Sequence, residues 1–245
     1  MTPELEAEGK LIVALDMPDT GEAYAFWQGL ALPCAIAKIG LELLYSGGGV
    51  ALVRRLAAEG TRVFVDAKLL DTSNTVERAT ARVAALGAAF LTVHAQDPLT
   101  VAAAARGRAG SNLKLLGITL LTSTPPGSLA AQGISLPPQE LVLRRAGFAA
   151  QAGFDGAVCS PWEARTLKAS FGAKLAAVCP GIRPRSGQAI AGDDQARTAT
   201  PGDALRAGAD YIVAGRPITC AADPAAAARS IVAEMALFCS RPRPS

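Results

Sequence analysis

The amino-acid sequence predicts a single-domain α/β protein of the (β/α)8 TIM-barrel class, and two features of the chain indicate it. Eight short apolar runs, rich in β-branched residues, alternate with Ala-, Leu- and Arg-rich amphipathic segments. Charged and polar residues follow the ends of these runs, as in barrels whose sites lie at the carboxyl ends of the strands. A doubly wound open sheet is the alternative, but the chain lacks a Gly-x-Gly-x-x-Gly turn, which makes it less favoured.

The expected strands are the short apolar runs themselves. In chain order they cover residues 11–16, 35–40, 62–68, 90–95, 115–121, 156–160, 175–180 and 211–216. Amphipathic segments between them, such as 76–86 and 141–152, are expected to be helices. Gly87, Gly153 and Gly208 are expected at helix C-termini, where a left-handed glycine often ends a helix.

Length and composition allow one sizeable domain. The chain has 245 residues and 50% hydrophobic content, and one barrel of this length is routine. We expect the barrel to occupy residues 1–239 and the Arg- and Pro-rich tail 240–245 to be disordered. The Pro-, Gly- and Ser-rich stretch 124–138 follows the fifth strand, and it is expected to be a long loop that serves either as a lid or as plain surface.

Charge, cysteine usage and hydropathy limit the cellular compartments and the binding partners that we expect for this protein. A net charge of +3 without a Lys/Arg block does not suggest nucleic acid. Five cysteines without a Cys-x-x-Cys pair favour reduced thiols over a disulfide framework or a zinc site. No apolar run approaches the roughly 18 residues of a membrane span, and the acidic N-terminus is unlike a signal peptide. We therefore expect a cytoplasmic protein with no membrane association.

Residues 63–75 are the most informative stretch of the chain. An apolar strand ends there in Asp66 and Lys68, which are two residues apart and so project from the same face, and Asp71 follows. Charges at the end of a buried strand are costly unless they pair with each other or with a ligand. A structural ion pair is the alternative, but the polar run 71–75 offers more donors and acceptors than one pair needs. The stretch therefore predicts a ligand site.

The ends of the other expected strands carry polar residues as well. From the first strand to the eighth they are Asp16, Lys38, His94, Thr122, Ser123, Arg183, Gly215 and Arg216. An arginine beside a small residue after the seventh and eighth strands favours a phosphorylated ligand, although a rim position is the alternative. His94 is the only histidine, which excludes a multi-histidine metal site, and a structural role is favoured for it over a catalytic one.

Taken together, these motifs resemble the orotidine 5′-phosphate decarboxylase family. The resemblance runs through residues 11–16 (LIVALD), 37–40 (AKIG), 65–75 (VDAKLLDTSNT), 121–123 (LTS), 179–184 (CPGIRP), 191–201 (AGDDQARTATP) and 211–219 (YIVAGRPIT). The Asp-x-Lys-x-x-Asp core alone is shared with related barrel enzymes that act on sugar phosphates. The Asn74-Thr75 ending and the downstream PGIR and GRPIT segments make the resemblance more specific.

The resemblance implies decarboxylation of orotidine 5′-phosphate to UMP in pyrimidine biosynthesis, with no metal or other cofactor. Lys68 would be the proton donor in a charged network with Lys38, Asp66 and Asp71. The implied substrate contacts are Asp16 and Lys38 at the ribose, Thr122 and Ser123 at the pyrimidine, and Gln195, Gly215 and Arg216 at the phosphate, with Arg183 nearby. The resemblance also implies a homodimer in which Asp71 and Thr75 reach into the partner's site.

The chain departs from the family pattern in three places. Thr72-Ser73 stands where an aliphatic residue followed by Pro or Gly is usual, and Cys179 replaces a common Thr. The segment after Arg183 is slightly longer, which leaves Gln188 as an alternative to Gln195. Two other functions stay open: a metal-dependent enzyme acting on a sugar phosphate, and a non-catalytic nucleotide-binding protein.

Overall fold

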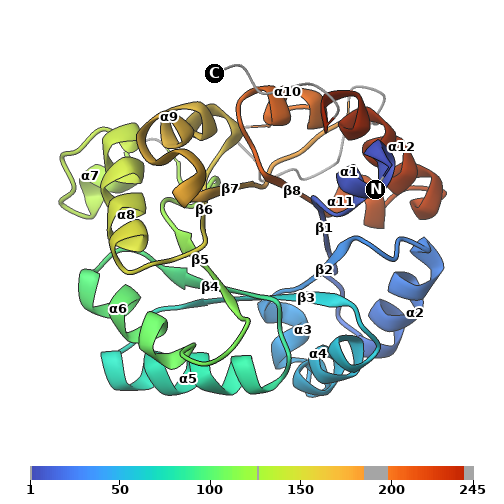
Figure 1. Cartoon of the computed structure of the whole chain (residues 1–245), viewed down its shortest axis with the longest axis horizontal. Coiled ribbons are helices and arrows are strands. Elements are labelled where there is room, and N and C mark those ends of the chain that lie inside the picture. Colours follow the sequence, from blue (N-terminus) through green and yellow to red (C-terminus); the bar gives the residue numbers. More distant parts are fainter. Residues whose placement is uncertain (1, 126, 185–197, 240–245) are drawn as a thin grey trace.

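The computed structural model describes residues 2–125, 127–184 and 198–239, and within them the chain folds as a closed parallel barrel (Figure 1). Neighbouring strands pair in chain order, and β8 pairs with β1 to close the barrel. The strands are β1 (Leu11–Ala14), β2 (Ile36–Ile39), β3 (Arg62–Leu69), β4 (Phe90–His94), β5 (Lys114–Ile118), β6 (Gly156–Val158), β7 (Ala176–Cys179) and β8 (Tyr211–Ala214). The predicted (β/α)8 fold is confirmed.

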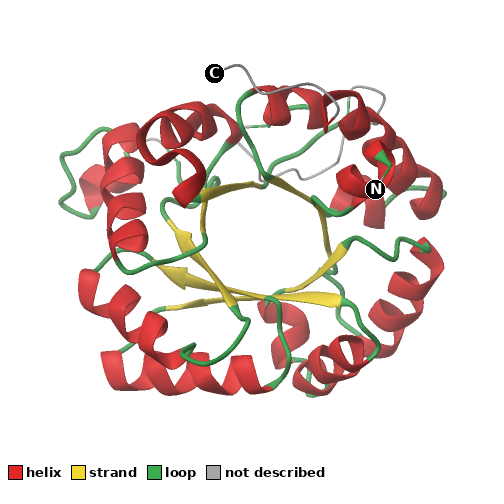
Figure 2. Cartoon of the chain, viewed as in Figure 1, coloured by secondary structure: helices red, strands yellow, loops and turns green. Residues whose placement is uncertain are grey.

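Helices surround the barrel on its outside (Figure 2). They are α1 (Pro3–Glu8), α2 (Thr20–Leu30), α3 (Leu41–Tyr45), α4 (Gly49–Ala58), α5 (Ser73–Ala85), α6 (Pro98–Gly107), α7 (Ser128–Ala131), α8 (Pro138–Gln151), α9 (Pro161–Phe171), α10 (Pro201–Arg206), α11 (Arg216–Thr219) and α12 (Pro224–Cys239). A 3-10 turn, Gly172–Lys174, follows α9. The N-terminal α1 packs against the C-terminal α12, so the first and last helices of the described chain lie side by side (Figure 1).

Most strands end one to three residues earlier than the sequence predicts, and β3 ends later. Residues such as Asp16 and Gly40, which follow β1 and β2, have left the strand and belong to the loops at its carboxyl end. A polar side chain at a strand end is better satisfied in a loop beside the cavity than inside the packed sheet. β3 instead continues to Leu69, which pairs with Val93 of β4 after an irregularity in the register.

Two apolar layers hold the barrel together. The inner layer fills the barrel with one large side chain from each of several strands, namely Ile12, Ile36, Phe64, Phe90, Leu116 and Val178. The outer layer lies between barrel and helices, and it takes the alternate strand positions such as Leu11, Val13, Val63 and Val65. This alternation is the expected period of two, and both layers are buried as in other barrels of this class.

Three glycines end helices as predicted, and one loop is more ordered than predicted. Gly87, Gly153 and Gly208 follow the last residues of α5, α8 and α10 with φ of +82°, +76° and +104°, a left-handed conformation that favours glycine. The stretch 124–138, expected to be a loop, contains the short helix α7 and the first residue of α8. Gln188, Gln195 and the tail 240–245 lie outside the described residues.

Two further features bear on the expected compartment. No helix in the described part of the chain combines the length and the apolarity needed to cross a membrane. The four cysteines whose side chains the structure describes, Cys34, Cys159, Cys179 and Cys220, are free thiols.

Candidate active site

A cavity of about 360 Å³ opens at the carboxyl ends of the barrel strands. Its polar lining is Asp16, Lys38, Asp66, Lys68, Thr122, Ser123, Arg183 and Arg216. Its apolar and glycine lining is Ala14, Phe64, Ile118, Leu120, Leu121, Val158, Val178, Pro180, Gly181, Val213 and Gly215. An apolar cavity with a few convergent polar groups is the usual form of a small-molecule site.

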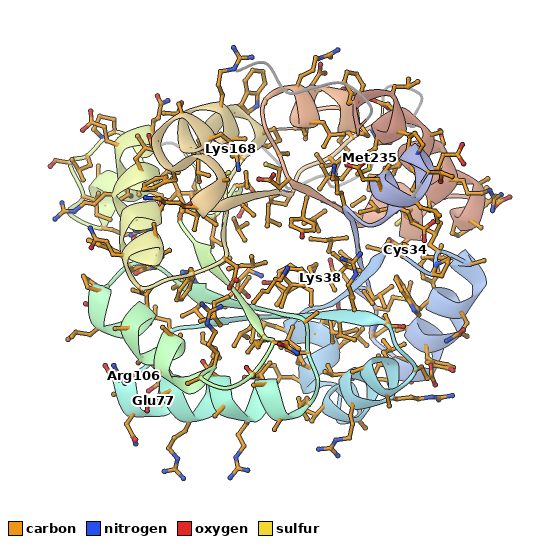
Figure 3. All side chains as sticks on the ribbon, viewed as in Figure 1. Cys34, Lys38, Glu77, Arg106, Lys168 and Met235 are labelled. Atoms are coloured by element: carbon orange, nitrogen blue, oxygen red, sulfur yellow. The ribbon has the colours of Figure 1, made fainter. Side chains whose placement is uncertain are left out.

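Four charged side chains form a continuous array along one wall of this cavity. Lys38 Nζ lies 3.0 Å from Asp16 Oδ1 and 3.5 Å from Asp66 Oδ2. Lys68 Nζ lies 2.7 Å from the same Asp66 Oδ2. The signs therefore alternate as acid, base, acid and base, from β1 across β2 to β3, and Lys38 points toward the interior of the barrel (Figure 3).

An irregularity in β3 builds the inner end of this array. Between the paired positions Val65–Leu91 and Leu69–Val93, three residues of β3 lie opposite a single residue of β4. Two extra residues leave the alternation along β3 unchanged, so Asp66 and Lys68 project from the same face, as the sequence predicts, and both line the cavity. Lys68 adopts φ +46°, a left-handed conformation that is costly for a residue with a Cβ. Such strain is typical of functional sites.

Gly40 leaves room for the outer end of the array. A Cβ at this position would lie 3.0 Å from Asp16 Oδ1 and 3.3 Å from Lys38 Nζ, tighter than ordinary contacts. A larger residue directly after β2 would therefore displace the Asp16–Lys38 pair. The Asp16–Lys38 pair thus explains why a glycine ends the AKIG segment: no larger residue fits beside the pair.

The electrostatics of the array keep Asp66 ionised. Burial alone would raise the pKa of Asp66, but the ammonium groups of Lys38 and Lys68 and hydrogen bonds from Lys68 and Thr92 outweigh it, and the pKa lies below its ordinary value. The Lys68 side chain is 31% exposed and the Asp66 side chain 11%. A ligand in the cavity therefore has better access to the Lys68 ammonium group than to the carboxylate behind it.

The part of the cavity that follows β7 and β8 carries two arginines. Arg183 follows β7 and donates a hydrogen bond to the Ile182 carbonyl at 2.8 Å. Arg216 follows β8 and is the first residue of the short helix α11, directly after Gly215. Both arginines line the cavity, as do Gly181 and Gly215 beside them. Loops after strands seven and eight, with a short extra helix, are a common phosphate site in barrels of this class.

Asp71 and Thr75 do not line the cavity of the described chain. Both are exposed, Asp71 in the loop after β3 and Thr75 in the first turn of α5. Asp71 Oδ1 accepts a hydrogen bond from the Thr72 amide at 2.6 Å, and the hydroxyls of Thr72 and Thr75 lie 3.0 Å apart. These two side chains are thus on the outer rim, turned to solvent.

His94 ends β4 near the charged array but is not part of the cavity wall. Its Nδ1 lies 3.3 Å from the Gln96 amide nitrogen. Burial, followed by the positive charges of Arg145 and Lys68, lowers the pKa of His94, which makes the neutral imidazole the stable form near pH 7. The ring is thus neutral and lies outside the cavity lining, and the structural role of His94 stays a prediction.

Thr92, in the middle of β4, is a site residue that sequence reasoning missed. Its hydroxyl lies 2.8 Å from Asp66 Oδ1 and 2.9 Å from the Lys68 amide nitrogen. Threonine is common in strands because it is β-branched, so one threonine in the apolar run of β4 did not stand out in the sequence.

Among the described residues, no group of three or more His, Cys, Asp or Glu side chains gathers as a metal ligand set.

A closed eight-stranded barrel with an alternating Asp–Lys array at the carboxyl ends of its strands places the chain among the (β/α)8-barrel enzymes. The model of the orotidine 5′-phosphate decarboxylase / HUMPS family matches residues 9–231. The chain belongs to this family.

Individual relatives agree with the family match. The orotidine 5′-phosphate decarboxylase of Methylobacterium radiotolerans is 48% identical over 236 residues, which cover 96% of this chain and 100% of the relative. That of a Bradyrhizobium species is 48% identical, covering 96% and 95% of the two chains. The crystal structure of orotidine 5′-phosphate decarboxylase from Lactobacillus acidophilus superposes with a TM-score of 0.81 at 36% identity, covering 92% of this chain and 98% of that one.

Proposed function

We propose that the chain decarboxylates orotidine 5′-phosphate to UMP, as the names of its relatives state for them. The observation that carries the proposal is the Asp16–Lys38–Asp66–Lys68 array inside the cavity of a chain 48% identical to such decarboxylases. Binding a nucleotide alone does not require two lysine ammonium groups within 3.5 Å of one buried carboxylate oxygen, Asp66 Oδ2.

In the proposed reaction the C6–carboxylate bond of the orotate ring breaks, CO₂ leaves, and the electron pair stays on C6. The Lys68 ammonium group stabilises this developing negative charge and then donates a proton to C6, and solvent afterwards restores the proton on Lys68. Asp66, ionised beside Lys68, holds the ammonium group in place and repels the substrate carboxylate. No metal or other cofactor takes part in this proposal.

Comparing the energy of charge repulsion with the free energy of enzymatic acceleration indicates which effect dominates. Two like unit charges 4 Å apart cost about 4 kcal/mol at an effective dielectric constant of 20. Enzymatic accelerations require roughly 8–23 kcal/mol. Repulsion between Asp66 and the substrate carboxylate is therefore too small to carry the reaction, and most of the effect must come from stabilisation of the transition state by Lys68 and from binding of the remote phosphate.

We propose contacts for the three parts of the substrate, the ribose, the pyrimidine and the phosphate, from the polar groups that line the cavity. Asp16 and Lys38 would bind the ribose hydroxyls, and Thr122 with Ser123 would bind the pyrimidine. Arg216, Gly215 and Arg183 would bind the phosphate, which an arginine fork suits. Gln195 is also proposed at the phosphate from the family resemblance, with Gln188 as the alternative, and both lie outside the described residues.

We further propose a homodimer in which Asp71 and Thr75 complete the partner's site. Both are exposed and outside their own cavity, although the family pattern counts them in the site. Apolar side chains on the same side of the barrel support a contact there: Leu41, Tyr45, Val50 and Leu70 on α3, α4 and the loop after β3 are 43%, 85%, 49% and 52% exposed. Exposed apolar residues gathered beside a site often mark an interface.

The proposed activity is tested by following the ultraviolet absorbance of orotidine 5′-phosphate incubated with the purified protein in EDTA. We expect conversion to UMP, and a rate that is unchanged when Mg²⁺ is added. Loss of activity in EDTA that returns with a divalent metal would favour the sugar-phosphate alternative. Tight UMP binding without any turnover would favour the non-catalytic nucleotide-binding protein.

Sharing of sites between subunits is tested by mixing two variants. Asp71→Ala and Lys68→Ala are each expected to be inactive alone, but a mixed dimer would contain one site with both native residues. Random reassortment of subunits should therefore restore about a quarter of the native sites. The two variants are unfolded and refolded together, and dimer formation is checked by size-exclusion chromatography. No recovery in a sample that is dimeric would contradict the shared site.

A further inference from the structure

Thr92 occupies a particular position in the irregular pairing of β3 with β4. It is the single β4 residue between Leu91 and Val93, and it lies opposite the β3 segment that carries Asp66 and Lys68. Regular ladder pairing is interrupted there, so the backbone groups of this segment need other partners. The Lys68 amide finds one in the Thr92 hydroxyl, 2.9 Å away.

The direction of the two hydrogen bonds follows from the chemistry of the partners. A backbone amide only donates and a carboxylate only accepts, whereas a hydroxyl does both. The Thr92 hydroxyl therefore accepts from the Lys68 amide and donates to Asp66 Oδ1 at 2.8 Å. Thr92 is fully buried, so water does not compete for either bond.

Each bond acts on a different part of the charged array. The bond to Oδ1 fixes the plane of the Asp66 carboxylate and leaves Oδ2 for the ammonium groups of Lys68 and Lys38. The bond to the Lys68 amide holds the backbone at φ +46°, the conformation from which the side chain reaches Asp66. Thr92 itself does not line the cavity, so it does not touch a ligand there.

We propose that Thr92 is a positioning residue for the reaction. Its hydroxyl orients the Asp66 carboxylate and at the same time holds the Lys68 backbone in its strained conformation. The proposal rests on the proposed decarboxylation for its kinetic consequence, but its structural part does not depend on that activity. In this proposal β4 controls the distance between Lys68 and Asp66. Among the described residues, no side chain of β4 lines the cavity.

The kinetic test replaces Thr92 with valine, which keeps the shape and removes the hydroxyl. We expect kcat to fall about 10- to 100-fold, the effect of losing a hydrogen bond to a charged group, while KM changes by less than about threefold. Thr92→Ser keeps the hydroxyl and should restore kcat to near the native value. The acid limb of the pH–rate profile should move to higher pH in Thr92→Val, because the Asp66 carboxylate loses a donor that favours its ionised form.

The matched control is Thr80→Val. Thr80 is also a fully buried threonine, on α5 away from the cavity, and its hydroxyl has no hydrogen-bond partner among the described residues. Removing that hydroxyl should leave kcat and KM unchanged. The control thus separates the loss of a buried hydroxyl in general from the loss of the one beside Asp66.

A second readout needs no turnover. The Asp66 carboxyl carbon is followed by ¹³C NMR against pH in the free protein, with Asp66→Asn used to assign the signal. Asp66 faces Lys38, Lys68 and, at the end of β4, His94, and these groups are the same in the native protein and in Thr92→Val. We expect the titration of Asp66 to move to higher pH in Thr92→Val and to return in Thr92→Ser.

The outcomes separate the two proposals. If the native protein does not convert orotidine 5′-phosphate, the proposed activity fails, and the titration of Asp66 still decides the role of Thr92. If Thr92→Val matches Thr80→Val in kcat and leaves the Asp66 titration unmoved, the positioning role is overturned. Should Thr92→Val not fold, Thr92→Ser and Thr92→Ala differ by the hydroxyl alone, and equal kcat values in these two would overturn it as well.

Discussion

Replacing Lys68 with alanine is expected to abolish nearly all turnover and to leave the barrel folded. The substitution removes both the proton donor for C6 and the positive charge that stabilises the developing carbanion. Proton transfer and charge stabilisation together predict a fall in kcat of about 10⁴-fold or more. The measurement is the initial rate of absorbance change of orotidine 5′-phosphate, with the circular dichroism spectrum as the test of folding.

Asp66 would not be left without partners in this variant. Lys38 Nζ stays 3.5 Å from Oδ2, and the Thr92 hydroxyl stays on Oδ1, so the buried charge keeps an ion pair and a hydrogen bond. Lys174→Ala, which removes an exposed lysine next to β7, is the control and should be fully active. Retention of a tenth of the native kcat by Lys68→Ala would contradict the assignment of Lys68 as the proton donor.

The backbone of Lys68 offers a further check on the same variant. A non-glycine residue in the left-handed region costs about 1 kcal/mol or more, whereas glycine adopts this region without that cost. Lys68→Gly is therefore expected to be at least as resistant to urea as Lys68→Ala and equally inactive. A Lys68→Gly variant that is stable but inactive is the result expected if the left-handed backbone of Lys68 costs stability and is kept for the site.

The fold was predictable from the sequence because its signals are local and repeated. Each apolar run followed by an amphipathic segment gives one strand and one helix, and repetition around the barrel makes the prediction robust to errors in single elements. The ends of strands were less predictable. Runs such as 11–16 continue in apolar or small residues up to the site, so nothing in composition marks where Asp16 leaves the sheet.

The charged array was predictable only in part. Alternation along β3 correctly put Asp66 and Lys68 on one face, because the irregularity adds two residues and so preserves the alternation. The irregularity itself, the left-handed Lys68 and the role of Thr92 depend on the pairing of two strands, which no local pattern encodes. The positions of Asp71 and Thr75 on the rim show the same limit, since their proposed partner is another chain.

Replacing Arg216 with alanine is expected to weaken the capture of orotidine 5′-phosphate. Arg216 lines the cavity at the first position of α11, where its guanidinium group would make charge-assisted hydrogen bonds to the phosphate. Loss of such bonds predicts a fall in kcat/KM of about 100-fold or more. The loss is measured as kcat/KM, because binding energy from the remote phosphate can act on kcat as well as on KM. Arg216→Lys should be intermediate, since it keeps the charge and loses the fork.

Orotidine, the substrate without its phosphate, isolates the interaction. If Arg216 binds the phosphate, the substitution should lower kcat/KM for orotidine 5′-phosphate and leave kcat/KM for orotidine nearly unchanged. Orotidine itself is expected to react more slowly, because it lacks the binding energy of the phosphate. A comparable loss on both substrates would instead indicate that Arg216 supports the cavity wall. Arg229→Ala on α12 removes an exposed arginine and controls for net charge. An unchanged kcat/KM in Arg216→Ala would remove this residue from the phosphate site and leave Arg183 as the arginine that lines the cavity there.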